Sequence, residues 1–155
     1  MNLSRLISRY QDAKFALRVS ARAETGGSLM LAITDEPPHG YLQGSIELHE
    51  DTRLPRQPLK KGALKAIENH ALQSGVLELP DEEAGPFVLN GVEYNLLDGV
   101  HYEIDIFWAG RQKQVKRIAS PEAAFTRLFN SVLELALPDS AMIQRALQLA
   151  CTSFK

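Results

Sequence analysis

The chain has 155 residues, 45% of them hydrophobic, which is enough for one domain with a buried core and too few for two. Its 17 basic and 19 acidic residues give a net charge of -2. This balance argues against the broad positive field of a protein that binds nucleic acid or anionic membranes. We predict a single globular domain over residues 1 to 155, with neither nucleic acid nor membrane as a partner.

The sequence also indicates a compartment. The single cysteine, Cys151, cannot form an internal disulfide, and no Cys/His spacing is typical of a zinc cluster. Arg5 and Arg9 interrupt the apolar residues near the N-terminus, unlike the apolar core of a signal peptide. No apolar run approaches the roughly 20 residues of a membrane-spanning helix. We therefore expect a cytoplasmic protein, without a cofactor.

In the first half of the chain, the apolar period changes along the sequence. Helical spacing predicts a short helix over residues 2 to 11, and alternation from Lys14 onward predicts a strand. Three strands are expected between residues 14 and 49 as an antiparallel meander. A polar, proline-broken connection should follow over residues 49 to 58, and then a middle helix over residues 59 to 74.

The second half begins with strand signals. Asn90-Gly91 is a strong hairpin dipeptide because both turn residues must adopt positive φ. For the next turn, at Asp98-Gly99, facial alternation favours a loop of odd length with a bulge. A third turn at Ala109-Gly110 completes a second meander over residues 86 to 118. These segments predict mostly antiparallel pairing.

Two helices are expected at the C-terminal end, over residues 120 to 136 and 139 to 153. The first should begin at Ser120-Pro121-Glu122, an N-cap serine followed by an N1 proline and an acid in the first turn. Apolar residues then recur at i, i+3, i+4 and i+7 in both segments. An antiparallel helix pair packed on a sheet gives an α+β fold.

His101, Glu103 and Asp105 occupy every second position of one predicted strand, as metal ligands or the polar face of a strand would. A two-residue turn at Ala109-Gly110 places Glu103 opposite Lys116, which favours a cross-strand ion pair. A lysine beside the carboxylates would also repel a cation. We interpret this row as a solvated face and predict no metal site.

Residues 107 to 111, FWAGR, are the strongest candidate for a binding site. Trp108 and Arg111 flank the expected hairpin tip, and tryptophan and arginine are enriched at binding hot spots. The alternative is that Trp108 folds onto the apolar face and Arg111 covers it. The predicted partner-binding residues are the hairpin residues Phe107, Trp108 and Arg111 and the acidic loop residues Asp81, Glu82 and Glu83.

Three classes of function fit these patterns. The sequence lacks the phosphate loop, the GxSxG elbow and HExxH, so no catalytic residue is assigned. We favour a protein-binding module, for example an immunity protein that neutralises a bacterial toxin, by analogy with that class of small acidic proteins. One alternative is an enzyme that uses His39, His101 and nearby carboxylates. The other is a homo-oligomeric structural or adaptor protein.

Overall fold

The structure of the protein is a computed structural model. The residues it describes are 13 to 23, 27 to 47, 51 to 81, 87 to 94, 100 to 118 and 121 to 151. The strands are β1 (Phe15–Ala23), β2 (Ser28–Thr34), β3 (Tyr41–Glu47), β4 (Asp51–Pro58), β5 (Phe87–Leu89), β6 (Val92–Tyr94), β7 (Val100–Trp108) and β8 (Arg111–Ile118). The helices are α2 (Ala63–Gln73), α3 (Ala123–Ala136) and α4 (Ser140–Cys151), with a 3-10 turn η1 (Val76–Glu78).

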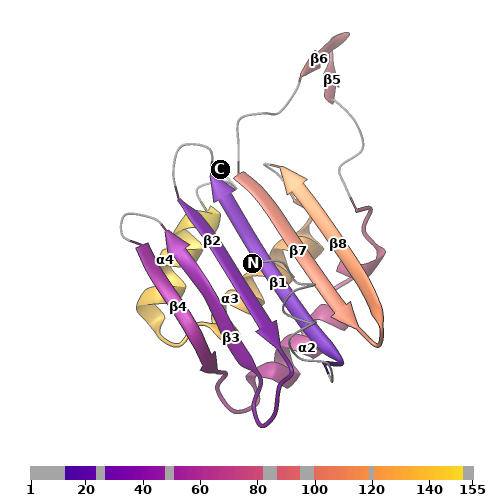
Figure 1. The fold of residues 1–155 in the computed structure, drawn as a ribbon. Coiled ribbons are helices and arrows are strands. Elements are labelled where there is room, and N and C mark those ends of the chain that lie inside the picture. Colours follow the sequence, from indigo (N-terminus) through magenta and orange to yellow (C-terminus); the bar gives the residue numbers. More distant parts are fainter. Residues whose placement is uncertain are drawn as a thin grey trace.

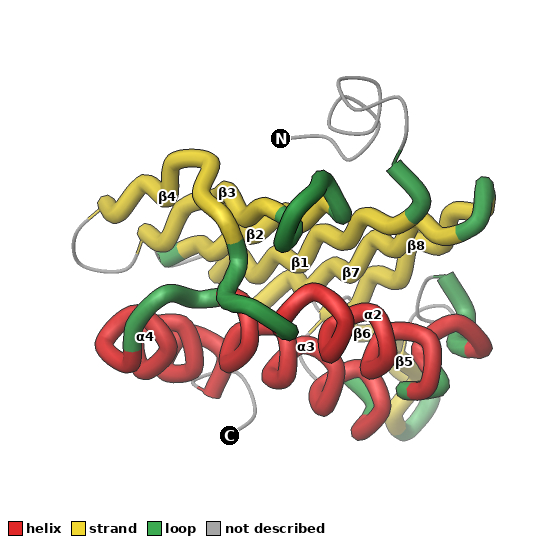
Figure 2. The backbone as a smooth tube through the Cα atoms, turned by 90° about the horizontal axis from the view of Figure 1, so that it is seen from below, coloured by secondary structure: helices red, strands yellow, loops and turns green. Residues whose placement is uncertain are grey.

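Six of the described strands form one antiparallel sheet in the order β4-β3-β2-β1-β7-β8 (Figure 1). Helices α2, α3 and α4 all lie on the same face of this sheet, as the view along its edge shows (Figure 2). We call the face toward these helices the helix face and the other the open face. The predicted α+β arrangement, with antiparallel pairing, a middle helix and a C-terminal helix pair, is confirmed.

The core lies between the helix face and α3. Tyr102 of β7 packs edge-to-face against Phe125 and Phe129 of α3, with ring centroids 6.2 and 5.6 Å apart. Because Tyr102 is paired with Ala21, the alternate buried residues of β1 from Phe15 to Ala21 face the same helix. Each large apolar side chain buried here contributes roughly 1.5 to 3 kcal/mol.

The β7–β8 hairpin has the predicted register. Ala109 and Gly110 both have positive φ, at 46° and 76°, as a two-residue turn requires. Glu103 is therefore opposite Lys116, and Trp108 is opposite Arg111. The local turn and the alternation of side chains were sufficient to predict this pairing.

The hairpin at Asn90-Gly91 is also confirmed, with φ values of 54° and 78°. It joins β5 to β6, and these strands form a two-stranded sheet of their own, drawn beyond the end of the larger sheet in Figure 1. In the six-stranded sheet, β7 pairs with β1 and β8. The odd loop predicted at Asp98-Gly99 and the helix predicted over residues 2 to 11 lie outside the described residues.

The predicted connection over residues 49 to 58 is wrong, because residues 51 to 58 form the edge strand β4. Prolines are tolerated at a sheet edge, where a missing N–H removes no ladder bond. Pro55 lies where the register of β3 and β4 shifts, between the pairs formed by Leu42 and Gly44. The two prolines that disfavoured a strand are thus compatible with one at this position.

The helix boundaries differ from the prediction by a few residues. Helix α2 begins at Ala63 rather than residue 59, after a turn in which Gly62 has a φ of 84°. Helix α3 begins at Ala123 with Glu122 as its N-cap residue, and Glu122 makes no side-chain cap bond. The predicted cap Ser120 lies outside the described residues. The carboxylate of Glu122 instead binds a buried arginine.

Candidate functional site

The tip of the β7–β8 hairpin is anchored to the first strand. The Ala109 N–H donates to the Lys14 carbonyl at 3.1 Å, and Trp108 is in register with Phe15. Trp108 is half-buried and packs against the hydrophobic core, while Arg111 beside it is exposed. The Trp108 ring therefore contributes to packing, and part of it remains accessible.

Phe107 lies next to the hairpin tip, whereas Asp81 lies beside the outer edge of β8. Phe107 is half-buried and points to the open face, opposite Ala16 of β1. The Asp81 side chain is 72% exposed, and its Oδ1 lies 2.5 Å from Lys113 Nζ of β8. The structure thus brings Asp81 next to the strand that carries Arg111. Glu82 and Glu83, the other predicted binding residues, lie outside the described residues.

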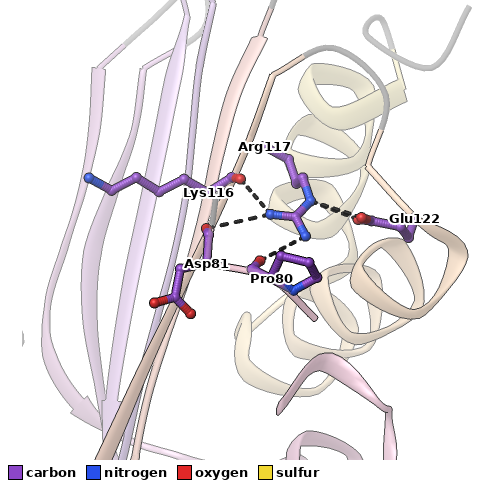
Figure 3. A network of polar contacts seen from close by, with 5 residues as sticks. All are labelled: Pro80, Asp81, Lys116, Arg117 and Glu122. Atoms are coloured by element: carbon purple, nitrogen blue, oxygen red, sulfur yellow. Dashed lines mark hydrogen bonds and ion pairs between the residues drawn. The ribbon is translucent and has the colours of Figure 1, made fainter. Parts of the chain in front are cut away.

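A buried arginine holds the segment of Asp81 against β8 (Figure 3). The Arg117 side chain is 1% exposed, and its Nε donates to both Glu122 oxygens, at 3.0 and 2.8 Å. Its two terminal nitrogens donate to the carbonyls of Pro80 at 2.9 Å and Lys116 at 2.7 Å. The Lys116 N–H in turn donates to the Asp81 carbonyl at 2.8 Å. We call this set of contacts the Arg117 clamp.

The clamp affects the ionisation of Glu122. The hydrogen bond from Arg117 lowers the pKa of Glu122, against a smaller opposing effect of burial. No role was predicted for Arg117 from the sequence, although it is one of the two polar or charged side chains of β7 and β8 that are buried. A signal was present, because strand alternation puts Arg117 on the same face as the buried Val115.

A second arginine binds the row of carboxylates on the open face. Arg18 Nε donates to Asp105 Oδ2 at 2.7 Å, and the same guanidinium pairs with Glu103. Gln114 Nε2 also donates to Glu103 Oε1 at 2.5 Å. Asp105 is 3% exposed at its side chain, and its Oδ1 has no hydrogen-bond partner in the described part of the chain. We call these contacts the Arg18 cluster.

The predicted solvated face is therefore wrong for Asp105, and Glu103 pairs with Arg18 rather than with Lys116. Burial is the main cause that raises the pKa of Glu103, and the nearby charge of Asp105 adds to it. Arg18 and Lys116 act in the opposite direction. Burial and the neighbouring Asp105 carboxylate thus raise the pKa of Glu103 despite the attraction of the Arg18 guanidinium.

The remaining candidates do not meet. His101 lies opposite Arg22 of β1, whereas His39 is exposed in the turn after β2. His101 is therefore beside one end of β1, and the strand that leads to His39 ends beside the other, since Thr34 is paired with Ala16. Among the described residues, no group of three His, Cys, Asp or Glu side chains is arranged to hold a metal ion.

The described geometry defines an α+β domain with a hairpin tip bonded to the Lys14 carbonyl and two arginine clusters, one on each face of its sheet. No described helix is long and apolar enough to cross a membrane. No model of a known protein family matches the chain, and no curated protein has a significantly similar sequence.

Proposed function

We propose that the protein is a non-enzymatic binding module that recognises another protein through the tip of the β7–β8 hairpin. The contact surface, which we call the tip surface, wraps around the end of the hairpin: Trp108 and Arg111 lie on the helix face, Phe107 lies on the open face, and Asp81 adds a carboxylate at the outer edge of β8. Aromatic residues and arginine are enriched at the energetic centres of protein interfaces. The partner would bury the accessible part of Trp108 and the guanidinium of Arg111.

The observation that carries this proposal is the position of an exposed Arg111 directly opposite Trp108, on a turn whose backbone is bonded to the residue before β1. The two residues flank a two-residue turn with positive φ at both positions, and the Ala109 N–H is bound to the Lys14 carbonyl. Packing of Trp108 against the core restricts its side chain further. A backbone and an aromatic side chain that are held in place before binding lose less conformational entropy when a partner binds.

A narrower form of the proposal is a toxin-neutralising immunity protein in a bacterial cytoplasm. It is supported by the small size of the chain, its net charge of -2 and the absence of common catalytic motifs from its sequence. These are properties of a class, so the support is an analogy. In this form, the partner would be a toxin whose active surface the hairpin tip covers.

The test compares capture of a partner by immobilised wild-type protein and by Arg111→Ala, from lysate of the source cells. Arg111 is exposed, so the free energy of unfolding of this variant should differ from that of the wild type by less than about 0.5 kcal/mol. We expect mass spectrometry to find one stoichiometric protein on the wild-type column and to find it depleted at least about tenfold on the variant column. Trp108→Ala is less suitable because loss of its core packing also lowers stability.

Arg127→Ala is the matched control, since Arg127 is an exposed arginine of α3 in the helix layer. This variant should capture the partner as well as the wild type does. Equal capture by the Arg111 and Arg127 variants would refute the tip surface as the contact. Activity of a captured toxin, measured with and without the protein, separates the inhibitor from a plain adaptor.

A further inference from the structure

The outer edge of β8 has backbone groups that point away from the sheet. In an antiparallel ladder, alternate residues bond to the neighbouring strand, and the pair that flanks a two-residue turn is bonded. Here that pair is Trp108 and Arg111, so Lys113 and Val115 also face β7. Gln112, Gln114 and Lys116 therefore direct their N–H and C=O groups outward. The bond from Lys116 N–H to Asp81 agrees with this assignment.

The Arg117 clamp closes only one end of this edge. The Lys116 N–H already donates to the Asp81 carbonyl at 2.8 Å, so it is not available to a residue of an added strand. Within the described part of the chain, no backbone group bonds to the outer side of Gln112 or Gln114. The described residues thus leave the outward backbone groups of β8 unbonded from Gln114 to the hairpin tip, next to Arg111. We call the stretch from Arg111 to Gln114 the open edge.

The opposite edge of the sheet is less suitable for strand addition. Strand β4 contains Pro55 and Pro58, which have no N–H to donate, and its register with β3 shifts in between. Prolines and irregular pairing are common ways in which a sheet edge avoids further pairing. The sheet thus has one edge that favours an added strand, and it is the edge beside the tip surface.

The charges along β8 indicate the chemistry of a matching segment. All four charged residues of β8 are basic: Arg111, Lys113, Lys116 and Arg117. Lys113 and Arg117 pair with Asp81 and Glu122, whereas Arg111 and Lys116 form no ion pair with any described residue. An incoming segment with carboxylates would complement these cations. A second copy of β8 would instead place basic residues against basic residues.

We propose that an extended, acidic segment of the partner protein adds to the open edge as a further strand of the sheet. Its backbone would bond to Gln112 and Gln114, and a carboxylate near the tip would pair with Arg111. This inference rests on the proposed function, because it gives the tip surface a recognition mode and a partner chemistry. Main-chain bonds supply affinity in such strand addition, and the alternate side chains supply specificity.

The first test uses a synthetic octapeptide in which glutamate alternates with threonine and valine, added to 15N-labelled protein. We expect saturable shifts of the Gln112 and Gln114 amide signals, with a Kd below about 1 mM, and slower hydrogen exchange at both amides. The same peptide with lysine in place of glutamate should bind at least about tenfold more weakly. Equal binding of both peptides, or shifts confined to other strands, would overturn the proposal.

Gln112→Pro supplies the second test, since it removes one outward N–H without removing a bond to β7. Its matched control is Gln112→Ala, which keeps that N–H. We expect loss of peptide binding by the proline variant alone. If the proline variant does not fold, the amide shifts of the wild-type protein decide the question. Equal binding by both variants overturns the proposal.

The remaining outcomes separate this inference from the proposed function. If Gln112→Pro still captures the partner in an Arg111-dependent way and the peptide does not bind, the tip surface stands and strand addition falls. If sedimentation shows a dimer that Gln112→Pro dissociates, a second copy occupies the edge and the acidic partner is excluded. If Arg111→Ala captures as the wild type does, the proposed function itself fails.

Discussion

Two arginines on opposite faces of the sheet are stabilised in different ways. Arg117, on the helix face, is 1% exposed and donates to one carboxylate and to backbone carbonyls. Arg18, on the open face, is 18% exposed and binds the two carboxylates of Glu103 and Asp105. The Arg117 clamp is thus a neutral ion pair completed by carbonyl dipoles, whereas the Arg18 cluster has an excess of one negative charge when both acids are ionised.

This difference has consequences for stability. Burying a guanidinium is tolerable when its nitrogens have acceptors, and in the clamp all three Arg117 nitrogens donate to oxygen atoms while fixing the Pro80–Asp81 segment beside β8. In the Arg18 cluster, one acceptor atom is unpaired, because Asp105 Oδ1 has no hydrogen-bond partner among the described residues. The contribution of the Arg18 cluster to stability should therefore depend on the protonation of its two carboxyls.

The largest effect is expected for Arg117→Met. The substitution keeps apolar packing but removes the buried guanidinium from Glu122 and from the carbonyls of Pro80 and Lys116. The free energy of unfolding should fall by about 3 kcal/mol, measured by urea denaturation at pH 7. Arg111→Met, an exposed arginine of the same strand, should change it by less than about 0.5 kcal/mol. Equal losses would show that Arg117 is no more important than a surface residue.

A smaller effect, dependent on pH, is expected for Arg18→Met. Removal of the guanidinium leaves Glu103 and Asp105 repelling each other in a partly buried site, so we expect a loss of about 2 kcal/mol at pH 7. Protonation relieves this repulsion, so the loss should shrink at pH 5. Addition of Asp105→Asn should restore part of the stability at pH 7. A loss that neither acid nor the second substitution reduces would contradict the electrostatic explanation.

The comparison also shows how far the sequence could predict this fold. The β7–β8 register followed from a local turn and from alternation, so every expected pair from Glu103–Lys116 to Trp108–Arg111 is present. In the Arg18 cluster, Arg18 is separated in sequence from Glu103 by 85 positions and from Asp105 by 87. The cluster therefore depends on β1 lying beside β7. No local pattern indicates which distant strand becomes a neighbour. The sequence therefore could not show that Arg18 pairs with Glu103 and Asp105.

The Arg117 clamp was missed for a different reason. Strand alternation placed Arg117 on the buried face, but its charge favoured an exposed position. Its acceptors come from the segment after η1 and from the start of α3, and only the folded chain brings these together. Strand β4 was missed for a similar reason. Its prolines are tolerated because β4 lies at the edge of the sheet, and only the order of the strands shows that it does. Predictions failed where a residue's environment is set by distant segments.

The smallest expected effect is a difference in the pH dependence of Glu103→Gln and Glu122→Gln. The pKa of Glu103 is raised, so its contribution to stability is present below the ordinary glutamate pKa of about 4.3 and is lost as pH rises through the folded-state value. The pKa of Glu122 is lowered, so its contribution is present above that ordinary value and is lost as pH falls through the folded-state value. The two carboxyls should therefore act with opposite sign.

Thermal unfolding of both variants and the wild type between pH 3 and about pH 8 measures this difference. Glu103→Gln should gain stability relative to the wild type as pH rises, whereas Glu122→Gln should lose it. Each change should stay below about 1 kcal/mol, and the Glu122 effect should be the smaller because its side chain is 46% exposed and screened by solvent. Curves of the same sign would mean that the attraction of Arg18 outweighs burial at Glu103. The two arginines would then stabilise their carboxylates in the same way, and the distinction between the two faces would be lost.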